Sequence, residues 1–218
     1  MGLIAIGDIH GCAATLGVLL ARLAPTEDDH LIFIGDYIDR GPDSKGVIDR
    51  LLALRRHQRC TFLRGNHEAF MLGYLRNRDF DLWGMNGGVA TLRSYADEDQ
   101  HVAIPEEHID FVRETRLYHD EPGFFFVHAG LRPELTIREN LIQCGEEVFL
   151  WEREHLNAPD LAWEKPVICG HTPKPEPLNR EKLIDIDTGC VYHMHPQMGR
   201  LTAVRLPERD FVMVNYVG

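Results

Sequence analysis

Five short apolar runs, each of strand length, end in a glycine-containing turn that carries a side chain able to bind a metal ion. The runs and their turns read LIAIGDIHG, LIFIGDYIDRG, CTFLRGNHE, GFFFVHAG and VICGHTP. The candidate ligands in these turns are Asp8, His10, Asp36, Asn66, His128 and His171. Independent turns would rarely place Asp, Asn or His at all five strand ends, so the pattern predicts one shared metal site.

Two helical patterns separate the first three apolar runs. Residues 13–23 carry leucines on one face, and residues 44–57 carry apolar side chains behind Asp43 or Ser44, either of which could cap a helix. Strands that alternate with helices run parallel and are joined by right-handed crossovers. Their carboxyl ends meet at one edge of the sheet, where sites form. Ligands that are distant in sequence are therefore expected to meet in space.

Length and composition favour a single domain over residues 1–218. A chain of 218 residues, 44% of them hydrophobic, can form one well-packed core. Residues 70–117 are mostly helical in pattern, which predicts a helical insertion bordering the site, with Trp83 and Tyr95 packed in the core. Residues 183–218 alternate apolar and polar side chains, which predicts an antiparallel meander.

Charge and the lack of targeting features argue against several partners. The 34 acidic residues outnumber the 23 basic ones and should repel a phosphate backbone, so we expect no binding to duplex nucleic acid. No apolar stretch approaches the roughly 20 residues of a membrane span, and nothing at the N-terminus resembles a signal peptide. The chain is expected to be cytoplasmic, to bind no membrane, and to be a monomer or a weak oligomer.

Ordinary roles are expected for the five cysteines and for the other histidines. The cysteines are scattered without a C-x-x-C pair, which argues against disulfides and against a zinc knuckle. A single histidine is more often a hydrogen-bonded residue than a ligand. This interpretation covers His30, His57, His101, His108, His119, His155, His193 and His195.

The types of candidate ligand indicate the metal chemistry. Carboxylate, imidazole and amide ligands without thiolate suit Mn²⁺, Fe or Zn²⁺, and of these we expect Mn²⁺. Six ligands exceed what one ion with an open position requires. Two divalent ions that share Asp36 would use all six, and such a pair stabilises the attacking and leaving oxygens of a displacement at phosphorus.

The motifs GDIHG, GDYIDRG, GNHE, HAG and GHTP, in this order, resemble the phosphoprotein phosphatase family of calcineurin-like metallophosphoesterases. The resemblance runs from Gly7 to about Gly189 and is strongest to the small bacterial and phage serine/threonine phosphatases, with support from NGG followed by TLRSY, from WERE and from DIDTGC. It implies an α/β sandwich of two mixed β-sheets packed face to face and flanked by helices. The C-terminal meander would belong to the second sheet, and Asp187 would be a structural turn residue.

The resemblance also implies a role for each candidate ligand. Asp8 and His10 would hold the first ion, and Asp36 would bridge both ions. The second ion would be held by Asn66, His128 and His171, together with Asp36.

Four further residues acquire roles from the same resemblance. Asp39 would pair with His67 and keep it protonated, so that His67 can donate a proton to the leaving oxygen. Arg40 and Arg153 would bind the phosphoryl oxygens, because planar guanidinium groups suit phosphate. Arg132 and Arg138 are nearby alternatives to Arg153, although Arg132 is expected to support its loop.

The expected activity is hydrolysis of phosphomonoesters by a metal-activated water. The implied enzyme is a serine/threonine protein phosphatase, or one of dual specificity, that acts on phosphorylated proteins or small phosphoesters. The alternative is a dinucleoside polyphosphate (diadenosine tetraphosphate) hydrolase of the same fold. Symmetrical hydrolases of that kind tend to carry Asp at the position of Glu68 and to lack the aspartate at Asp39, which favours the phosphatase.

Three other classes fit less well. A nuclease of the wider superfamily usually has a second histidine two residues after His171, where this chain has Pro173. A cysteine-based phosphatase needs an arginine six positions after a cysteine, and the sequence contains no such pair. An inactive binding module would have lost a ligand or His67, and all are present.

Overall fold

The structure is a computed structural model that describes residues 2–218. Within this range the strands form two sheets of five strands each. The first sheet has the order β10 (Asp210–Asn215), β9 (Arg200–Leu206), β1 (Leu3–Ile6), β2 (His30–Phe33) and β3 (Arg59–Phe62). Strands β1, β2 and β3 are parallel, as their sequence predicts, whereas β9 pairs antiparallel with β1, and β10 pairs antiparallel with β9. All three parallel strands therefore end at the same edge of the sheet.

The second sheet has a parallel centre and antiparallel edges. Its order is β4 (Tyr118–Glu121), β5 (Phe124–Val127), β6 (Val167–Cys169), β8 (Leu183–Asp185) and β7 (Leu178–Asn179). Strands β5, β6 and β8 are parallel, and β4 and β7 pair antiparallel to them. Both sheets are thus mixed, as the family resemblance implies.

The side chains of successive strand residues point to opposite faces of each sheet. Ala5 and Ile32 pack between the two sheets, while Ile4 and Leu31 face the helices outside the first sheet. Phe126 likewise packs between the sheets. The alternation creates separate apolar cores between the sheets and on their outer faces, which confirms the predicted sandwich.

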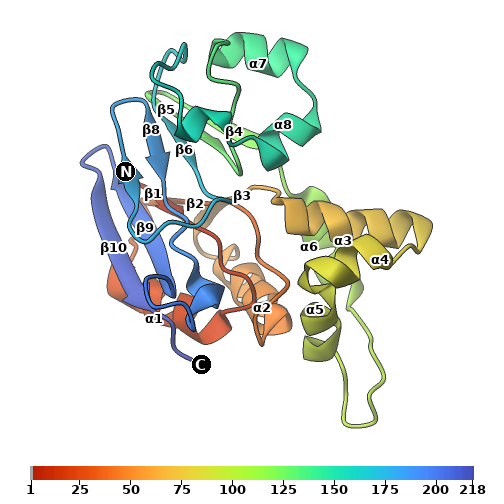
Figure 1. Ribbon diagram of the computed structural model, residues 1–218. Coiled ribbons are helices and arrows are strands. Elements are labelled where there is room, and N and C mark those ends of the chain that lie inside the picture. Colours follow the sequence, from red (N-terminus) through yellow and green to blue (C-terminus); the bar gives the residue numbers. More distant parts are fainter. Residues whose placement is uncertain (1) are drawn as a thin grey trace.

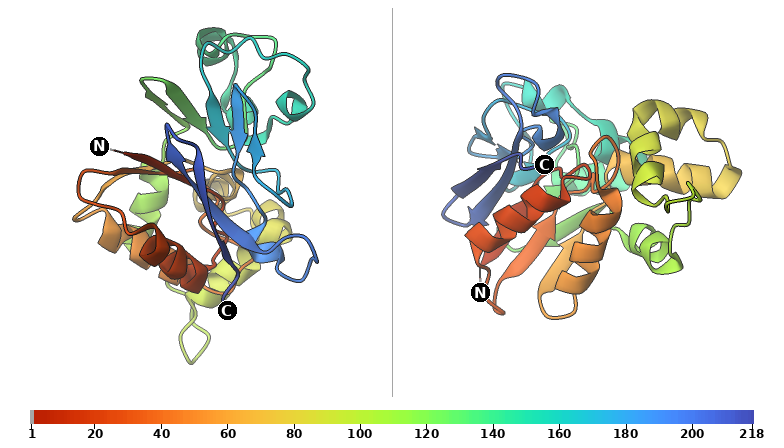
Figure 2. Two further views of the ribbon diagram at one scale, coloured as in Figure 1. Left: turned by 90° about the vertical axis from the view of Figure 1, so that its left-hand side faces the viewer. Right: turned by 90° about the horizontal axis from the view of Figure 1, so that it is seen from below.

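Helices α1 (Ala13–Leu23) and α2 (Ser44–Leu54) lie side by side against the outer face of the first sheet (Figure 1; Figure 2, right). The Asp43 carboxylate accepts the Gly46 N–H at 2.8 Å and caps α2, as predicted. Helices α7 (Ile137–Gln143) and α8 (Glu146–Trp151) lie beside the second sheet. The result is a helix–sheet–sheet–helix arrangement.

A group of helices follows β3 and lies to one side of the sandwich (Figure 1). It comprises α3 (Asn66–Asn77), α4 (Asp81–Trp83), a π-helical turn η1 (Gly84–Gly88), α5 (Val89–Ser94) and α6 (Glu106–Glu114). Helix α3 begins at Asn66, before the expected position 70, where the Glu68 side chain accepts the Gly65 N–H at 2.9 Å and caps the first turn. The single-domain assignment over residues 1–218 stays a prediction.

The C-terminal segment differs from its prediction. Only β8 lies in the second sheet; the hairpin of β9 and β10 pairs with β1 at the edge of the first sheet, after a short 3-10 helix η3 (Cys190–Tyr192). Alternating side chains predict half-buried strands, but they carry no information about which sheet edge a strand will join.

Membrane-spanning helices and disulfide bonds are both absent from residues 2–218. None of the helices there combines the length and the apolar character that crossing a bilayer requires. All five cysteines are free.

Candidate metal centre

The turns that follow β1, β2, β3, β5 and β6 meet at one edge of the sandwich, as the parallel strands predict. Two groups of side-chain atoms there could each hold a cation. The first consists of His10, Asp36 and His67, and the second of Asp36, His128 and His171; within each group the ligand atoms lie within 4.8 Å of one another. Asp36 belongs to both groups, which is the position expected of a bridging carboxylate.

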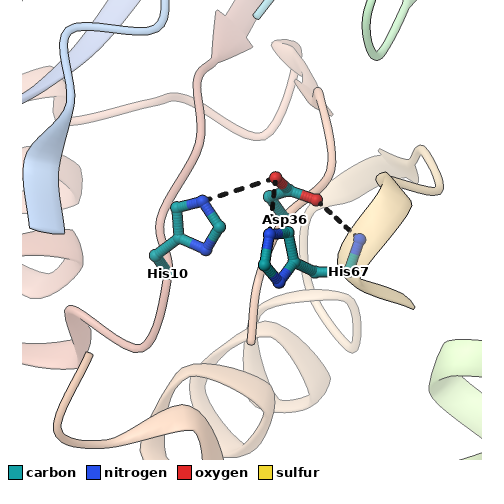
Figure 3. A group of neighbouring side chains, drawn as sticks. All are labelled: His10, Asp36 and His67. Carbon is teal, nitrogen blue, oxygen red and sulfur yellow. Dashed lines mark hydrogen bonds and ion pairs between the residues drawn. The ribbon is translucent and has the colours of Figure 1, made fainter. Parts of the chain in front are cut away.

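Asp36 is buried at the centre of this site (Figure 3). Its Oδ2 lies 3.4 Å from His10 Nε2, and its Oδ1 lies 3.5 Å from His128 Nε2. Oδ1 also accepts the His67 backbone N–H at 3.1 Å, at the start of α3, where the helix N-terminus favours a negative charge. Burial alone would raise the pKa of Asp36, but interactions with the histidines around it, including His67, whose own pKa is raised, lower it well below its usual range. The carboxylate is therefore ionised.

His10 and His128 present an unprotonated nitrogen to Asp36. In each ring Nδ1 lies 3.0 Å from a backbone carbonyl, that of Ile38 for His10 and that of Ile34 for His128. A carbonyl can only accept, so Nδ1 carries the proton and Nε2 keeps its lone pair. Burial lowers the pKa of both histidines, to about 3 for His10. Both rings are thus neutral and suited to bind a metal.

Asn66 brings His128 and His171 together. Its Oδ1 lies 3.0 Å from His128 Nε2 and 2.9 Å from His171 Nδ1. Because neither Oδ1 of Asn66 nor Nε2 of His128 carries a proton, their lone pairs face each other. A cation bound between them would turn this unfavourable contact into a favourable one.

Asp8 completes the predicted ligand set, but it also lies among buried carboxylates. Its Oδ2 accepts the His171 N–H at 3.0 Å, while its buried Oδ1 has no hydrogen-bond partner in the described part of the chain. Burial, Asp187 and Asp36 raise the pKa of Asp8, and burial raises that of Asp187 to about 7. Asp185, also fully buried, adds to this crowding. Such a set of oxygens fits divalent cations, which would neutralise it.

The sequence did not predict the contribution of Asp185 and Asp187. The segment DIDTGC only supports the family resemblance, which implies that Asp187 is a structural turn residue. Its Oδ1 does accept the Gly189 N–H at 2.9 Å within that turn. The useful signal would have been two further carboxylates at the end of β8, with Asp185 as its last residue and Asp187 in the turn that follows, similar to the other strand ends.

Comparisons with known proteins agree with this geometry. The sequence profile of the family described as calcineurin-like phosphoesterases matches residues 1–202. The chain belongs to this family. Because phosphoesterases hydrolyse phosphate esters, the chain is a hydrolase. Members of this family depend on metal ions for activity.

Three similar proteins illustrate the range of the family. A bis(5'-nucleosyl)-tetraphosphatase of Anoxybacillus flavithermus, described as asymmetrical, is 30% identical over 96% of this chain and 92% of that protein. A crystal structure provisionally assigned as a diadenosine tetraphosphatase has a TM-score of 0.74 at 24% identity and covers 100% of this chain and 94% of that one. The structure of a serine/threonine phosphatase from Saccharomyces cerevisiae has a TM-score of 0.66 at 15% identity. The match covers 100% of this chain and 80% of that one. The two structures show a shared fold.

Beside the ligands, this calcineurin-like phosphoesterase contains a fully buried pair formed by Asp39 and His67. Asp39 Oδ2 lies 2.7 Å from His67 Nδ1. Burial would lower the pKa of His67, but Asp36 and Asp39 outweigh it, so the pKa is raised. His67 Nε2 has no hydrogen-bond partner in the described residues and lies 4.0 Å from Asp36 Oδ2. The pair therefore favours a protonated imidazole at the site.

The helical insertion holds Asp39 in place. Trp83 Nε1 donates to both Asp39 oxygens at 2.9 Å, and the Thr91 hydroxyl donates to Oδ1 at 2.6 Å. The Asp39 backbone N–H is also satisfied, by Thr91 Oγ1 at 2.8 Å and Ser44 Oγ at 3.1 Å. The sequence predicted only core packing for Trp83, which is indeed buried, and assigned no role to Thr91.

A buried carboxylate, that of Glu68, connects two of the site turns. Its Oε2 accepts the N–H groups of Asp36 at 2.8 Å and Gly65 at 2.9 Å, and its Oε1 accepts that of Tyr37 at 2.9 Å. Burial and the charge of Asp36 raise the pKa of Glu68 to about 7. In the sequence Glu68 distinguishes enzyme types, but its contacts to both turns depend on the tertiary fold and are not apparent there.

The predicted arginines lie on different parts of the site. Arg40 Nη1 lies 3.0 Å from His10 Nε2, and its guanidinium lies 5.7 Å from the centroid of the Tyr192 ring. Arg153 is exposed and donates from Nε to Thr172 Oγ1 at 3.1 Å, next to His171. Both arginines are thus beside candidate ligands.

The alternative arginines lie elsewhere. The Arg132 carbonyl accepts the Trp163 indole N–H at 3.1 Å, and the Arg132 backbone N–H donates to Asn140 Oδ1 at 2.9 Å. The backbone of Arg132 therefore connects its loop to neighbouring elements. Arg138 lies on α7 beside Glu164 and Lys165. This placement favours Arg153 over both alternatives.

Five residues of the site have left-handed backbone conformations. Their φ angles are 47° for His10, 51° for Asp36, 73° for Asp39, 68° for Arg40 and 68° for His171. Non-glycine residues rarely adopt such angles. The turns therefore hold these side chains in place at an energetic cost.

Proposed function

We propose that this chain hydrolyses dinucleoside polyphosphates such as diadenosine tetraphosphate. One observation carries the proposal: the bis(5'-nucleosyl)-tetraphosphatase from A. flavithermus is similar over 96% of this chain, at 30% identity. The sequence alone favours the phosphatase over this activity, because symmetrical hydrolases differ from this chain at Glu68 and Asp39. The similar protein is described as asymmetrical, so that contrast does not apply to it.

The proposal includes two divalent ions, with Mn²⁺ preferred over Fe or Zn²⁺. One ion would be held by His10 and Asp36 together with Asp8, rather than with His67, and the other by Asp36, Asn66, His128 and His171. Two bound cations would lower the pKa of a water molecule and neutralise charge on the phosphoryl group. Arg40 would have to leave His10 Nε2, because its Nη1 occupies the lone pair that a metal ligand needs.

The remaining residues would bind the substrate and move a proton. Arg40 and Arg153 would hold phosphoryl oxygens from two sides of the candidate centre. His67 would hold a proton on Nε2 and donate it to the leaving oxygen, and Asp39 would orient the ring through Nδ1.

Two exposed aromatic rings give the nucleoside parts of the substrate a place to bind. The ring of Trp151, 41% exposed, lies 5.4 Å from that of His171, and Tyr192, 38% exposed, lies under Arg40. Bases stack on such rings with a gain of about 1–3 kcal/mol each. A substrate with two bases and a polyphosphate chain matches two aromatic rings beside the arginines.

The second candidate is a serine/threonine protein phosphatase. The observation that favours it is the buried Asp39–His67 pair, since the alkoxide of serine or threonine needs a proton to leave. A nucleotide is a much weaker base, so its departure depends less on the proton of His67.

The experiment compares specificity constants on one preparation reconstituted with Mn²⁺. The substrates are diadenosine tetraphosphate and peptides carrying phosphoserine, phosphothreonine or phosphotyrosine. We expect the highest kcat/KM for diadenosine tetraphosphate, with ATP and AMP as products. A higher kcat/KM for a phosphopeptide would refute the proposal and support the second candidate.

A variant of Trp151 tests the base-binding part. Trp151→Ala should raise KM for diadenosine tetraphosphate about tenfold, within the 1–3 kcal/mol of a stacked base. It should leave KM for p-nitrophenyl phosphate, which has no nucleobase, nearly unchanged. An equal rise for both substrates would show that Trp151 supports the site in general.

A further inference from the structure

A second cluster of metal-binding side chains lies at the opposite end of the parallel strands. His30 is the first residue of β2, whereas the turn with Asp36 follows its last residue. His119 and Glu121 lie on β4, in the other sheet. We propose that His30, His119 and Glu121 form a binding site for one Zn²⁺ ion that links the two sheets.

The three ligand atoms already lie at distances suited to one small ion. Glu121 Oε1 lies 3.3 Å from His30 Nδ1 and 3.0 Å from His119 Nε2. Ligands at about 2.0–2.2 Å from a tetrahedral Zn²⁺ lie roughly 3.3–3.6 Å from one another. The two imidazole rings stand nearly perpendicular, at 81°, with centroids 5.2 Å apart. The two distances to Glu121 Oε1 are thus within a few tenths of an ångström of those in a tetrahedral zinc site, and all three ligand atoms lie within 4.8 Å of one another.

His30 provides the strongest sign of a missing ligand. The residue is 1% exposed, and its Nδ1 is a buried atom with no hydrogen-bond partner among the described residues. Its Nε2 lies 2.9 Å from Thr61 Oγ1, and donation to that hydroxyl leaves Nδ1 with a free lone pair. In this tautomer the lone pair faces Glu121 Oε1 at 3.3 Å, and a cation between the two atoms would make the contact favourable; in the other tautomer Nδ1 donates to that oxygen.

The surroundings match those of known zinc ligands. Metal-bound histidines usually donate their other N–H to an oxygen, as His30 can to Thr61. The side chains of His119 and Glu121 are 15% and 18% exposed, which leaves a route for an ion and a water ligand.

One positive charge competes with the ion. Arg59 Nη2 lies 3.4 Å from Glu121 Oε1, and the Arg59 side chain is 52% exposed. A bound Zn²⁺ would displace this guanidinium toward solvent. Removing the charge should therefore tighten zinc binding.

Two imidazoles and one carboxylate, with a fourth position open to water, form a ligand set typical of Zn²⁺. The site would join the start of β2 to the edge strand β4. It is separated from the candidate catalytic centre by the length of β2, roughly 10 Å at 3.3 Å per residue. Loss of this ion is therefore expected to affect stability rather than turnover.

The test counts zinc bound to the full chain. Metal-stripped protein is dialysed against Zn²⁺, and zinc and protein are measured by elemental analysis and absorbance. His119→Ala and Glu121→Gln should each bind one Zn²⁺ per chain fewer than the unmodified protein. Each should also lose the part of the Zn²⁺-induced rise in Tm that this site contributes. Arg59→Gln should keep the ion and bind it more tightly.

His101→Ala is the matched control, because His101 Nδ1 also lies near a carboxylate oxygen, 3.7 Å from Asp97 Oδ2, but on an exposed segment. It should bind as much zinc as the unmodified protein. Hydrolysis of p-nitrophenyl phosphate with Mn²⁺ should be unchanged in all four variants. Equal zinc content in His119→Ala, Glu121→Gln and the unmodified protein would overturn the proposal. If His119→Ala does not fold, Glu121→Gln, which keeps the shape of the side chain, decides the question alone.

Discussion

Asp36 and Asp39 lie in one turn, yet their carboxylates contact different groups. Asp36 faces the imidazoles of both candidate ion positions, whereas Asp39 contacts His67, Trp83 and Thr91. Asp36→Asn should therefore empty or weaken both positions, because the shared ligand loses its charge. Asp39→Asn should keep both ions. Elemental analysis of the two variants after Mn²⁺ reconstitution checks this, and equal metal loss would contradict it.

His67 gives a test that depends on the leaving group. His67→Asn should slow hydrolysis of a phosphoserine peptide by a factor on the order of 10² to 10⁴, the usual contribution of a positioned acid. The loss should be smaller for p-nitrophenyl phosphate and diadenosine tetraphosphate, whose leaving groups need little protonation. Steady-state rates at matched metal content provide the measurement. A uniform loss over all three substrates would remove His67 from the role of acid.

At the scale of elements, the helical insertion contributes to the site through Trp83 at the end of α4 and Thr91 on α5. Trp83→Phe keeps an aromatic ring but removes the N–H that Asp39 accepts. Hydrogen bonds to charged groups contribute about 1.5–3 kcal/mol, so kcat for a phosphoserine peptide should fall about 10- to 100-fold. The metal content should not change.

Trp163→Phe is the control for that variant. Trp163 is also buried and also loses an indole hydrogen bond, to the Arg132 carbonyl, but it does not contact Asp39. Its kcat should therefore stay close to that of the unmodified protein. If both variants lose the same activity, Trp83 acts through general packing.

The sequence predicted some elements well and others poorly, for physical reasons. The strands before the ligand turns and α1 could be predicted because apolar periodicity and turn residues are local signals. Alternation alone could not assign β9 and β10 to a sheet, because both sheets offer a similar half-buried face. The partners of Asp39 were missed because Trp83 and Thr91 reach it only through the tertiary fold.

At the scale of the whole molecule, the buried histidine His155 makes stability depend on pH. Burial and the charges of Lys174 and Arg180 lower its pKa to about 4, against about 6.5 in an unfolded chain. Between these values the unfolded chain binds more protons, so the free energy of unfolding falls as pH decreases from about 6.5 to 4. The contribution is fully present above pH 6.5.

The change between pH 7 and pH 5 should amount to about 2 kcal/mol for this one group. His155→Gln should remove that part of the pH dependence, whatever its effect on stability at pH 7. Urea unfolding at both pH values, with a chelator present, measures it for the variant and the unmodified protein. The exposed variant His101→Ala should retain the full dependence. Parallel curves for His155→Gln and the unmodified protein would show that His155 makes no such contribution.

The left-handed residues of the site have a consequence for the protein without its ions. Each left-handed conformation costs roughly 1–2 kcal/mol. Five of them lie in three turns: the turn with Asp8 and His10, the turn with Asp36, and the turn with His171. Bound cations would offset this cost by holding the turns together. When cations are scarce, these turns should be the first part of the molecule to open locally, which would expose their amides to hydrogen exchange and proteases. The availability of metal in the cell would then govern the lifetime of the protein as well as its activity.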